Sequence, residues 1–141
     1  MGGGDVETGV IRQTVRLAAS PATVYALLVD PERHSAFTDA PATGKPVVNG
    51  QFTAWAEYIV GRHLVLEPGR RIVQEWRTTE WPDGASPSHL EIVLVADGEG
   101  CILTMVHADV PTSQIDDYAQ GWEDFYWAPM RAYLAQRASS D

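Results

Sequence analysis

Apolar and polar residues alternate at the start of the chain. Over residues 10–17, Ile11, Val15 and Leu17 share one face, and polar side chains such as Arg16 occupy the other. A period of two is typical of a strand with one buried face. The pattern therefore predicts a first strand over residues 10–17 with one side in water, preceded by a flexible Gly-rich leader over residues 1–9.

A helical period follows this strand. Ser20 offers an N-cap hydroxyl, and Pro21 suits the first helical position. Apolar residues then recur at helical spacing up to Asp30, which predicts a short amphipathic helix. Residues 31–37 can add one or two further turns, and the prolines and glycine of residues 41–46 predict a connection.

The middle of the chain is rich in aromatic and β-branched residues, which favour strands. The predicted strands cover residues 52–60, 62–66, 71–79, 89–96 and 101–110. The clearest turn sequences between them are Glu67-Pro68-Gly69, Trp81-Pro82-Asp83-Gly84 and Asp97-Gly98-Glu99-Gly100. Antiparallel pairing of successive strands is the simplest topology for such a meander.

A long helix is predicted from a cap at Thr112 or Ser113 to Arg137. Its apolar residues at i, i+3 and i+4 spacing form a stripe that faces the sheet. The stripe consists of Ile115, Ala119, Trp122, Tyr126, Met130 and Tyr133. Pro129 has no N–H to donate, and it is expected to bend the helix near Phe125.

This order of elements predicts an α+β fold, in which a curved antiparallel sheet of six or seven strands wraps around a long C-terminal helix. One or two short helices follow the first strand. Bulky side chains must project inward to fill a curved sheet, and they either pack it solidly or leave an apolar gap. An apolar gap with a few polar groups is typical of a small-molecule site.

Composition narrows the class of protein. The chain has 141 residues, of which 45% are hydrophobic, enough for one domain, predicted over residues 10–138. Its formal net charge of −9 argues against nucleic-acid binding, and eight of the acidic residues lie in residues 97–141. A single cysteine, Cys101, excludes an intrachain disulfide, and no apolar run is long enough to span a bilayer. A cytoplasmic location is therefore expected.

Several short motifs together resemble the C-terminal domain of the activator of heat-shock protein 90 ATPase. They are Trp76-Arg77, Trp81-Pro82-Asp83-Gly84, the strand Leu90-Glu91-Ile92-Val93-Leu94, His107 before Val110-Pro111, and Gly121-Trp122 followed by Phe125-Tyr126-Trp127. The resemblance covers about residues 10–135 and places the chain in the SRPBCC, or START-like, helix-grip superfamily.

The resemblance implies a cavity between the sheet and the last helix. Stand-alone relatives include binders of hydrophobic molecules, polyketide cyclases and aromatases, and natural-product resistance proteins. Eukaryotic activators carry a separate N-terminal domain, and nothing like it precedes Val10, which favours ligand binding over a co-chaperone role. The expected ligand-binding residues are Phe37, Trp55, Trp76, Met105, His107, Tyr118, Trp122 and Tyr126.

The histidines are the main candidates for chemistry. They are His34, His63, His89 and His107. His89 and Glu91 lack a third ligand, so no metal is predicted, and no glycine pattern indicates a nucleotide or another cofactor. His107 shares a strand face with Leu103 and Met105. If that face points inward, His107 could bind a ligand, serve as the acid and base of a cyclase or aromatase, or have a structural role only.

An acidic group on the last helix supports an alternative function. It consists of Asp116, Asp117, Glu123 and Asp124. These residues could dock a basic partner such as a heat-shock protein 90-type chaperone, or they could simply form a solvated helix face. The main hypothesis is a non-catalytic binder of a hydrophobic or aromatic small molecule.

Overall fold

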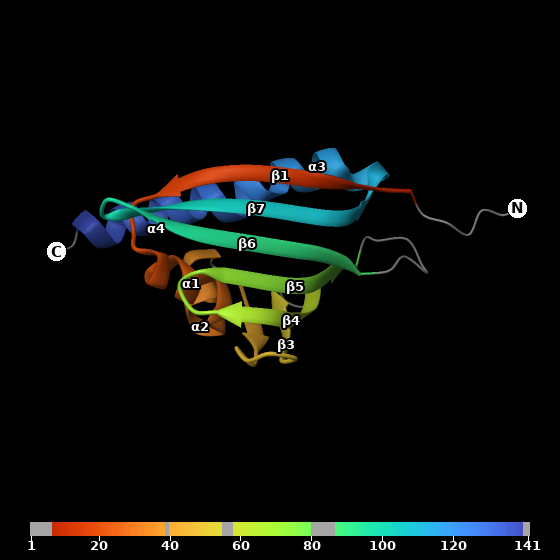
Figure 1. The fold of residues 1–141 in the computed structure, drawn as a ribbon, viewed down its shortest axis with the longest axis horizontal. Coiled ribbons are helices and arrows are strands. Elements are labelled where there is room, and N and C mark those ends of the chain that lie inside the picture. Colours follow the sequence, from red (N-terminus) through yellow and green to blue (C-terminus); the bar gives the residue numbers. More distant parts are fainter. Residues whose placement is uncertain (1–6, 39, 55–57, 80–86, 140–141) are drawn as a thin grey trace, which may run out of the picture.

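The structure, a computed structural model, describes residues 7–38, 40–54, 58–79 and 87–139, and the side chains as far as residue 136 (Figure 1). Strand structure starts at Thr8, two residues earlier than the alternation predicts. The carbonyl oxygen of Glu7 accepts hydrogen bonds from the N–H and the hydroxyl of Thr112, at 2.9 and 3.1 Å. The prediction that the leader extends to residue 9 is therefore wrong, because Glu7 bonds Thr112 and β1 already includes Thr8 and Gly9.

Seven strands form one antiparallel sheet in the order β1-β7-β6-β5-β4-β3-β2. The strands are β1 (Thr8–Leu17), β2 (Ala42–Gly44), β3 (Gln51–Ala54), β4 (Ile59–Glu67), β5 (Arg71–Thr78), β6 (Ser88–Asp97) and β7 (Gly100–Pro111). Successive strands from β2 to β7 pair with each other, as predicted, and β1 joins the free edge of β7. The predicted fold class is confirmed.

The helices lie together on one face of the sheet, behind it in Figure 1. They are α1 (Pro21–Val29), α2 (Pro31–Thr38), the 3₁₀ turn η1 (Thr112–Gln114), α3 (Ile115–Trp122), the π-helical turn η2 (Glu123–Trp127) and α4 (Ala128–Ser139). The start of α1 follows the prediction, because the Ser20 hydroxyl accepts the N–H of Thr23 at 3.2 Å and Pro21 occupies the first turn. In the described part of the chain, no helix is long and apolar enough to cross a membrane.

The predicted strand over residues 52–60 is wrong. Ala54 at the end of β3 pairs with Ile59 at the start of β4, so the chain reverses direction between them. Gly61 suggests a strand boundary in the sequence, but it lies inside β4. A Cβ atom at Gly61 would lie 2.4 Å from both the Phe52 ring and the Glu75 carbonyl oxygen, so this glycine permits close packing rather than a turn.

The connection predicted over residues 41–46 contains the short edge strand β2. Its Ala42, Thr43 and Gly44 pair with β3. Pro41, Gly44 and Pro46, which suggest a connection in the sequence, are compatible with an edge strand. One side of such a strand needs no hydrogen bonds to a neighbouring strand. Two of the clearest turns are where they were expected, and Trp81-Pro82-Asp83-Gly84 lies outside the described residues.

The last helix differs from the prediction at both its start and its middle. Neither Thr112 nor Ser113 caps it, because the Thr112 hydroxyl bonds Glu7 instead and a 3₁₀ turn leads into α3. At η2 the N–H of Ala128 bonds the carbonyl oxygen of Glu123, five residues earlier, a π-type bond. Pro129 offers no N–H to the Phe125 carbonyl, so the predicted disturbance near Phe125 takes the form of a π-turn.

The π-turn changes which aromatic residues face the sheet. Trp122, Tyr126 and Met130 are buried as predicted, but Trp127, outside the predicted stripe, is only 1% exposed. A π-turn holds one more residue per turn than an α-turn, so Tyr126 and Trp127 can both point into the protein. Leu134, four residues after Met130, is also buried, and Tyr133 is partly buried against the core as predicted.

Gln13 of β1 fastens this irregular helix to the sheet. Its Nε2 donates to the Ala119 carbonyl oxygen at 2.8 Å, and its Oε1 accepts the indole N–H of Trp127 at 2.6 Å. The same side chain therefore serves α3 and η2. Because the indole is almost fully buried, its N–H would otherwise have no bond to replace the one it makes with water.

We expect Gln13→Ala to lower the free energy of unfolding by about 1–3 kcal/mol, since it leaves the buried indole N–H without an acceptor. Urea denaturation followed by circular dichroism measures this change. Thr14→Ala, an exposed neighbour on the same strand, is the matched control and is expected to have little effect. Equal losses in the two variants would contradict the role of Gln13.

Candidate functional site

Two hollows lie on either side of a set of aromatic side chains between the sheet and the last helix. We call Trp76, Trp122 and Tyr126 the aromatic wall, because these residues line both hollows. The inner cavity, between α1, α2 and the sheet, has a volume of about 30 Å³. The outer pocket, between the start of β4, β5 and the helical segment α3–η2, has a volume of about 580 Å³. Of these two hollows, the outer pocket is the one with space for an organic molecule.

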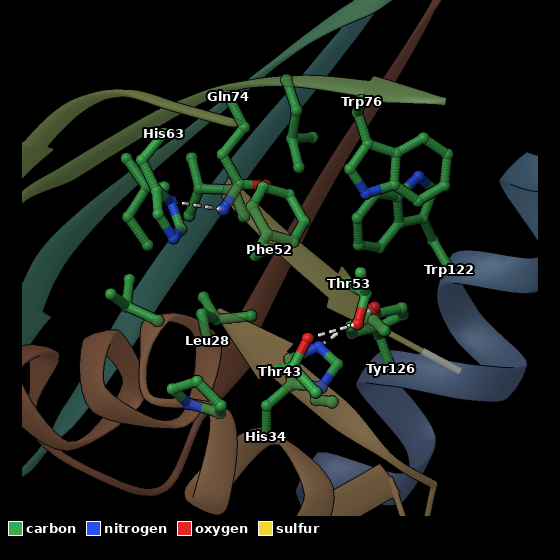
Figure 2. A pocket seen from close by; sticks show the side chains of 17 residues that line it. Leu28, His34, Thr43, Phe52, Thr53, His63, Gln74, Trp76, Trp122 and Tyr126 are labelled. Atoms are coloured by element: carbon green, nitrogen blue, oxygen red, sulfur yellow. Dashed lines mark hydrogen bonds between the residues drawn. The ribbon is translucent and has the colours of Figure 1, made fainter. Parts of the chain in front are cut away.

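The inner cavity has polar side chains at opposite ends (Figure 2). His34 of α2 lies at one end, and His63 of β4 with Gln74 of β5 lies at the other. Apolar residues such as Leu28 and Phe52 fill the space between. A cavity of this volume can hold one or two water molecules, since each needs about 10–15 Å³ on this measure.

His63 is neutral and has a defined tautomer. The Gln74 amide Nε2 donates to His63 Nδ1 at 3.2 Å, so the ring proton is carried by Nε2. The ring stacks on Phe52 with a centroid distance of 4.8 Å. Burial lowers the pKa of His63 to about 4, because the imidazolium would lose its hydration.

His34 contacts the aromatic wall from the side of the inner cavity. Its Nε2 lies 3.1 Å from the Tyr126 hydroxyl, and its ring makes edge contacts with Tyr126 and Phe37 at centroid distances of 5.3 Å. The side chain is only 8% exposed, and Nδ1 has no hydrogen-bond partner among the described residues. Burial lowers the pKa of His34 to about 4.

His107 points inward, which is one of the two orientations that the sequence allows. It connects the aromatic wall to three strands. The indole N–H of Trp122 donates to His107 Nδ1 at 3.2 Å, so the ring proton is on Nε2 and bonds Ser88 Oγ at 2.7 Å. The Ser88 hydroxyl then donates to the Trp76 carbonyl oxygen at 2.7 Å. Each group in this chain has its partner within the protein, and burial lowers the pKa of His107 to about 3.

The outer pocket is mostly aromatic. Its lining residues are Tyr58, Ile59, Trp76, Asp117, Tyr118, Gly121, Trp122, Phe125 and Tyr126. The Tyr118 hydroxyl bonds Thr78 Oγ1 and lies 3.5 Å from the Tyr58 hydroxyl. Phe125 is 55% exposed, because the π-turn directs it away from the core.

The expected ligand-binding residues divide between this pocket and the core. Trp76, Tyr118, Trp122 and Tyr126 line the outer pocket. Phe37, Met105 and His107 are buried and line neither hollow, and Trp55 lies outside the described residues.

Residues that the sequence analysis did not select also form the site. They are Tyr58, Ile59, Gly121 and Phe125 in the outer pocket and Ser88 in the chain from His107. The motif Gly121-Trp122 followed by Phe125-Tyr126 is present in the sequence, but only the π-turn shows which of its members face the pocket.

The acidic residues of the last helix have different surroundings. Asp117 lines the outer pocket, and Asp116 is exposed. Glu123 forms an ion pair with Arg131, and the Asp124 carboxylate accepts a hydrogen bond from Gln120 at 2.9 Å. Within the described ranges, no three His, Cys, Asp or Glu side chains come together as a possible metal site.

The three buried histidines predict a loss of stability in mild acid. Their pKa values rise to about 6.5 on unfolding, so the unfolded chain binds more protons below that pH. The stability that the three neutral histidines give the folded protein is fully present above about pH 6.5. It declines as the pH falls toward their pKa values in the folded protein, about 4 for His34 and His63 and about 3 for His107. Between pH 7 and pH 5, each buried histidine should lower the free energy of unfolding by an amount on the order of 2 kcal/mol.

Urea denaturation at pH 7 and pH 5 measures this loss, which we expect to reach several kcal/mol. Long-range ¹H–¹⁵N spectra of the folded protein should show His107 as the neutral tautomer with the proton on Nε2 at both pH values. An unchanged free energy of unfolding, or a charged His107 in the folded protein at pH 5, would contradict the assignment.

Comparison with known proteins agrees with this architecture. The chain is 30% identical over 108 residues to activator of 90 kDa heat shock protein ATPase homolog 1 from Homo sapiens, covering 77% of this chain and 32% of that protein. The homologous activator from Dictyostelium discoideum is 26% identical over 117 residues, covering 82% of this chain and 30% of the relative. The chain thus spans about a third of the length of these curated relatives.

A solved structure shows the same fold. The HSP90 activator from Plasmodium falciparum superimposes with a TM-score of 0.83 at 15% identity, covering 90% of this chain and 96% of that one. The model of the family described as "Activator of Hsp90 ATPase homolog 1-like protein" matches residues 18–135, which include the aromatic wall and both hollows. The chain therefore belongs to the Activator of Hsp90 ATPase homolog 1-like family, with the helix-grip fold.

Proposed function

We propose that the protein binds a hydrophobic or aromatic small molecule in the outer pocket. The observation that supports this proposal is an open pocket with a volume of about 580 Å³, lined mainly by aromatic side chains. Ligand pockets commonly have volumes of about 300–1,000 Å³ and are lined by apolar and aromatic groups with a few polar ones. The inner cavity, at about 30 Å³, is too small to hold such a ligand.

Apolar contact would supply the affinity. A ligand that buries about 300 Å² of its apolar surface gains about 7 kcal/mol before the cost of immobilisation is subtracted. Trp76 and Trp122 offer a paired surface, with ring centroids 5.7 Å apart and planes 26° apart. Tyr58 and Tyr118 provide hydroxyl groups that can orient the ligand.

His107 acts in this proposal as a positioning residue. Its hydrogen bond to the Trp122 indole sets the rotation of that ring, and its bond to Ser88 connects the ring to β6. A role as the acid and base of a cyclase or aromatase would require His107 to break these bonds and to reach a ligand beyond Trp122. The geometry therefore supports binding better than catalysis.

We expect Gly121→Leu to weaken ligand binding by about tenfold or more, because the new side chain would occupy the outer pocket. The substitution is compatible with the helix, since a Cβ atom at this position lies 3.7 Å from the Phe125 ring, an ordinary contact. Titration with the neutral fluorophore N-phenyl-1-naphthylamine measures binding.

Gln120→Leu is the matched control, because it adds the same side chain at the neighbouring, exposed position outside the pocket. It should bind the fluorophore as the parent protein does. Equal binding by the parent protein and Gly121→Leu, or the absence of binding by the parent protein, would contradict the proposal.

A second candidate is the docking of a heat-shock protein 90-type chaperone. The names of the human and Dictyostelium relatives support it, as does the presence of exposed acidic residues and an exposed aromatic ring on one helical segment. Asp116, Asp117, Asp124 and the ring of Phe125 are all exposed, and they lie on the same helical segment α3–η2. A basic surface with an apolar pocket would complement this face.

For this second candidate, reversing Asp116, Asp117 and Asp124 to lysine should weaken binding to a purified heat-shock protein 90 by about tenfold or more. Biolayer interferometry at low and high salt measures the affinity. The control is Glu32→Lys with Glu99→Lys, which changes exposed charges on α2 and in the β6–β7 turn. Loss of affinity in the control to the same extent would exclude a specific docking face.

A further inference from the structure

We propose that the outer pocket is selective for an organic cation, namely an aromatic or aliphatic molecule that carries a substituted ammonium group. This inference rests on the proposed function, since it specifies the ligand class of the same pocket. It follows from three properties of the lining: the kind of polar atom present, the arrangement of the rings, and the charge of the surrounding surface.

The ionisable and hydroxyl groups of the lining all present oxygen. Among the described lining residues they are the Asp117 carboxylate and the hydroxyls of Tyr58 and Tyr118, since the Tyr126 hydroxyl lies against His34 on the side of the inner cavity. No lysine, arginine or histidine is among the described lining residues. A carboxylate and hydroxyl oxygens can accept hydrogen bonds or face a positive charge, whereas an anionic ligand would meet no cationic side chain in this lining.

Six of the nine lining residues are aromatic. The face of an aromatic ring carries negative electrostatic potential, so several rings around one space attract a cation and favour it over a neutral group of equal size. Substituted ammonium groups suit such a site, because their methyl groups contact the rings and their charge is only weakly hydrated.

The rings of the lining are not all parallel: Trp76 and Trp122 stack with planes 26° apart, whereas the tyrosine rings are inclined to them. Trp76 and Tyr118 are nearly perpendicular, at 87° with centroids 6.0 Å apart. Trp122 is tilted by 45° from Tyr126 at a centroid distance of 4.7 Å. A flat neutral ring is held best by two parallel surfaces, whereas a compact tetrahedral ammonium group can contact surfaces that meet at an angle.

The surrounding charges favour the same ligand. Asp116 and Asp124 are exposed on the helical segment that carries Asp117, while Arg131 is already in an ion pair with Glu123. With a formal net charge of −9, the whole protein also attracts cations from solution. Asp117 is the charged residue in the lining itself, so it is the position at which selectivity can be tested.

The test compares two molecules of the same shape. (3-Hydroxyphenyl)trimethylammonium and 3-tert-butylphenol differ in the replacement of a positively charged nitrogen by carbon, and 3-hydroxybenzoate provides an anion of similar chemistry. Isothermal titration calorimetry measures their affinities, and the indole ¹H–¹⁵N signals of Trp76 and Trp122 report the location. We expect the cation to bind about tenfold or more tightly than the neutral phenol, and the anion to bind most weakly.

Asp117→Asn should weaken binding of the cation by about three- to tenfold and reduce the preference for the cation over 3-tert-butylphenol to the same extent. Glu99→Gln, which removes one exposed charge in the β6–β7 turn, should change neither affinity and serves as the control for net charge. Circular dichroism melts of both variants confirm that the fold is retained.

The outcomes separate this inference from the proposed function. Equal affinities for the cation and the neutral phenol, or an Asp117→Asn variant that keeps the full preference for the cation, would overturn cation selectivity. If N-phenyl-1-naphthylamine still binds the parent protein and not Gly121→Leu, hydrophobic binding stands without it. If neither that fluorophore nor any of the three test molecules binds, both proposals are overturned.

Discussion

The hydrogen-bonded chain from Trp122 through His107 and Ser88 to the Trp76 carbonyl holds the last helix in place against the sheet. It connects α3 to β7, β6 and β5 through groups that are almost completely buried. Each donor in the chain has one acceptor, so the imidazole must be neutral, with its proton on Nε2. Adding a proton to His107 would place a second donor against the Trp122 N–H. Burial lowers the pKa of His107, so the imidazole stays neutral and its hydrogen bond fixes the orientation of Trp122.

The π-turn is the second constraint on the site, and it originates from a single missing N–H. Because Pro129 cannot bond the Phe125 carbonyl, the helix takes an extra residue into the turn before it. Tyr126 and Trp127 then both face inward, where Trp127 bonds Gln13 and Tyr126 lies against His34. Phe125 is directed outward at the margin of the outer pocket. The local irregularity of the helix thus determines the positions of its aromatic residues.

These constraints divide the space between sheet and helix into two parts of different character. The aromatic wall borders the inner cavity, which has a few polar side chains and little volume. The space for a ligand lies instead on the other side of the wall, where Asp117 and the exposed Phe125 are part of the lining. Membership of the Activator of Hsp90 ATPase homolog 1-like family establishes the fold. The chemistry of the outer pocket belongs to the particular side chains of this chain.

Local sequence patterns determined the α+β class and the pairing of successive strands. They also determined the cap of α1 by Ser20 and the inward orientation of Trp122 and Tyr126. All of these features depend on hydrophobic periodicity and on single-residue preferences. Local patterns did not determine the hairpin between Ala54 and Ile59, since Gly61 serves a contact with Phe52 that exists only after the strands have paired. Nor could the sequence show that Phe37, Met105 and His107 are buried and line neither hollow. It also could not show that Tyr58 and Phe125 line the outer pocket. A pocket is the volume left between side chains from distant segments, and its size follows from helix register and ring orientation. Only the tertiary structure decides those quantities.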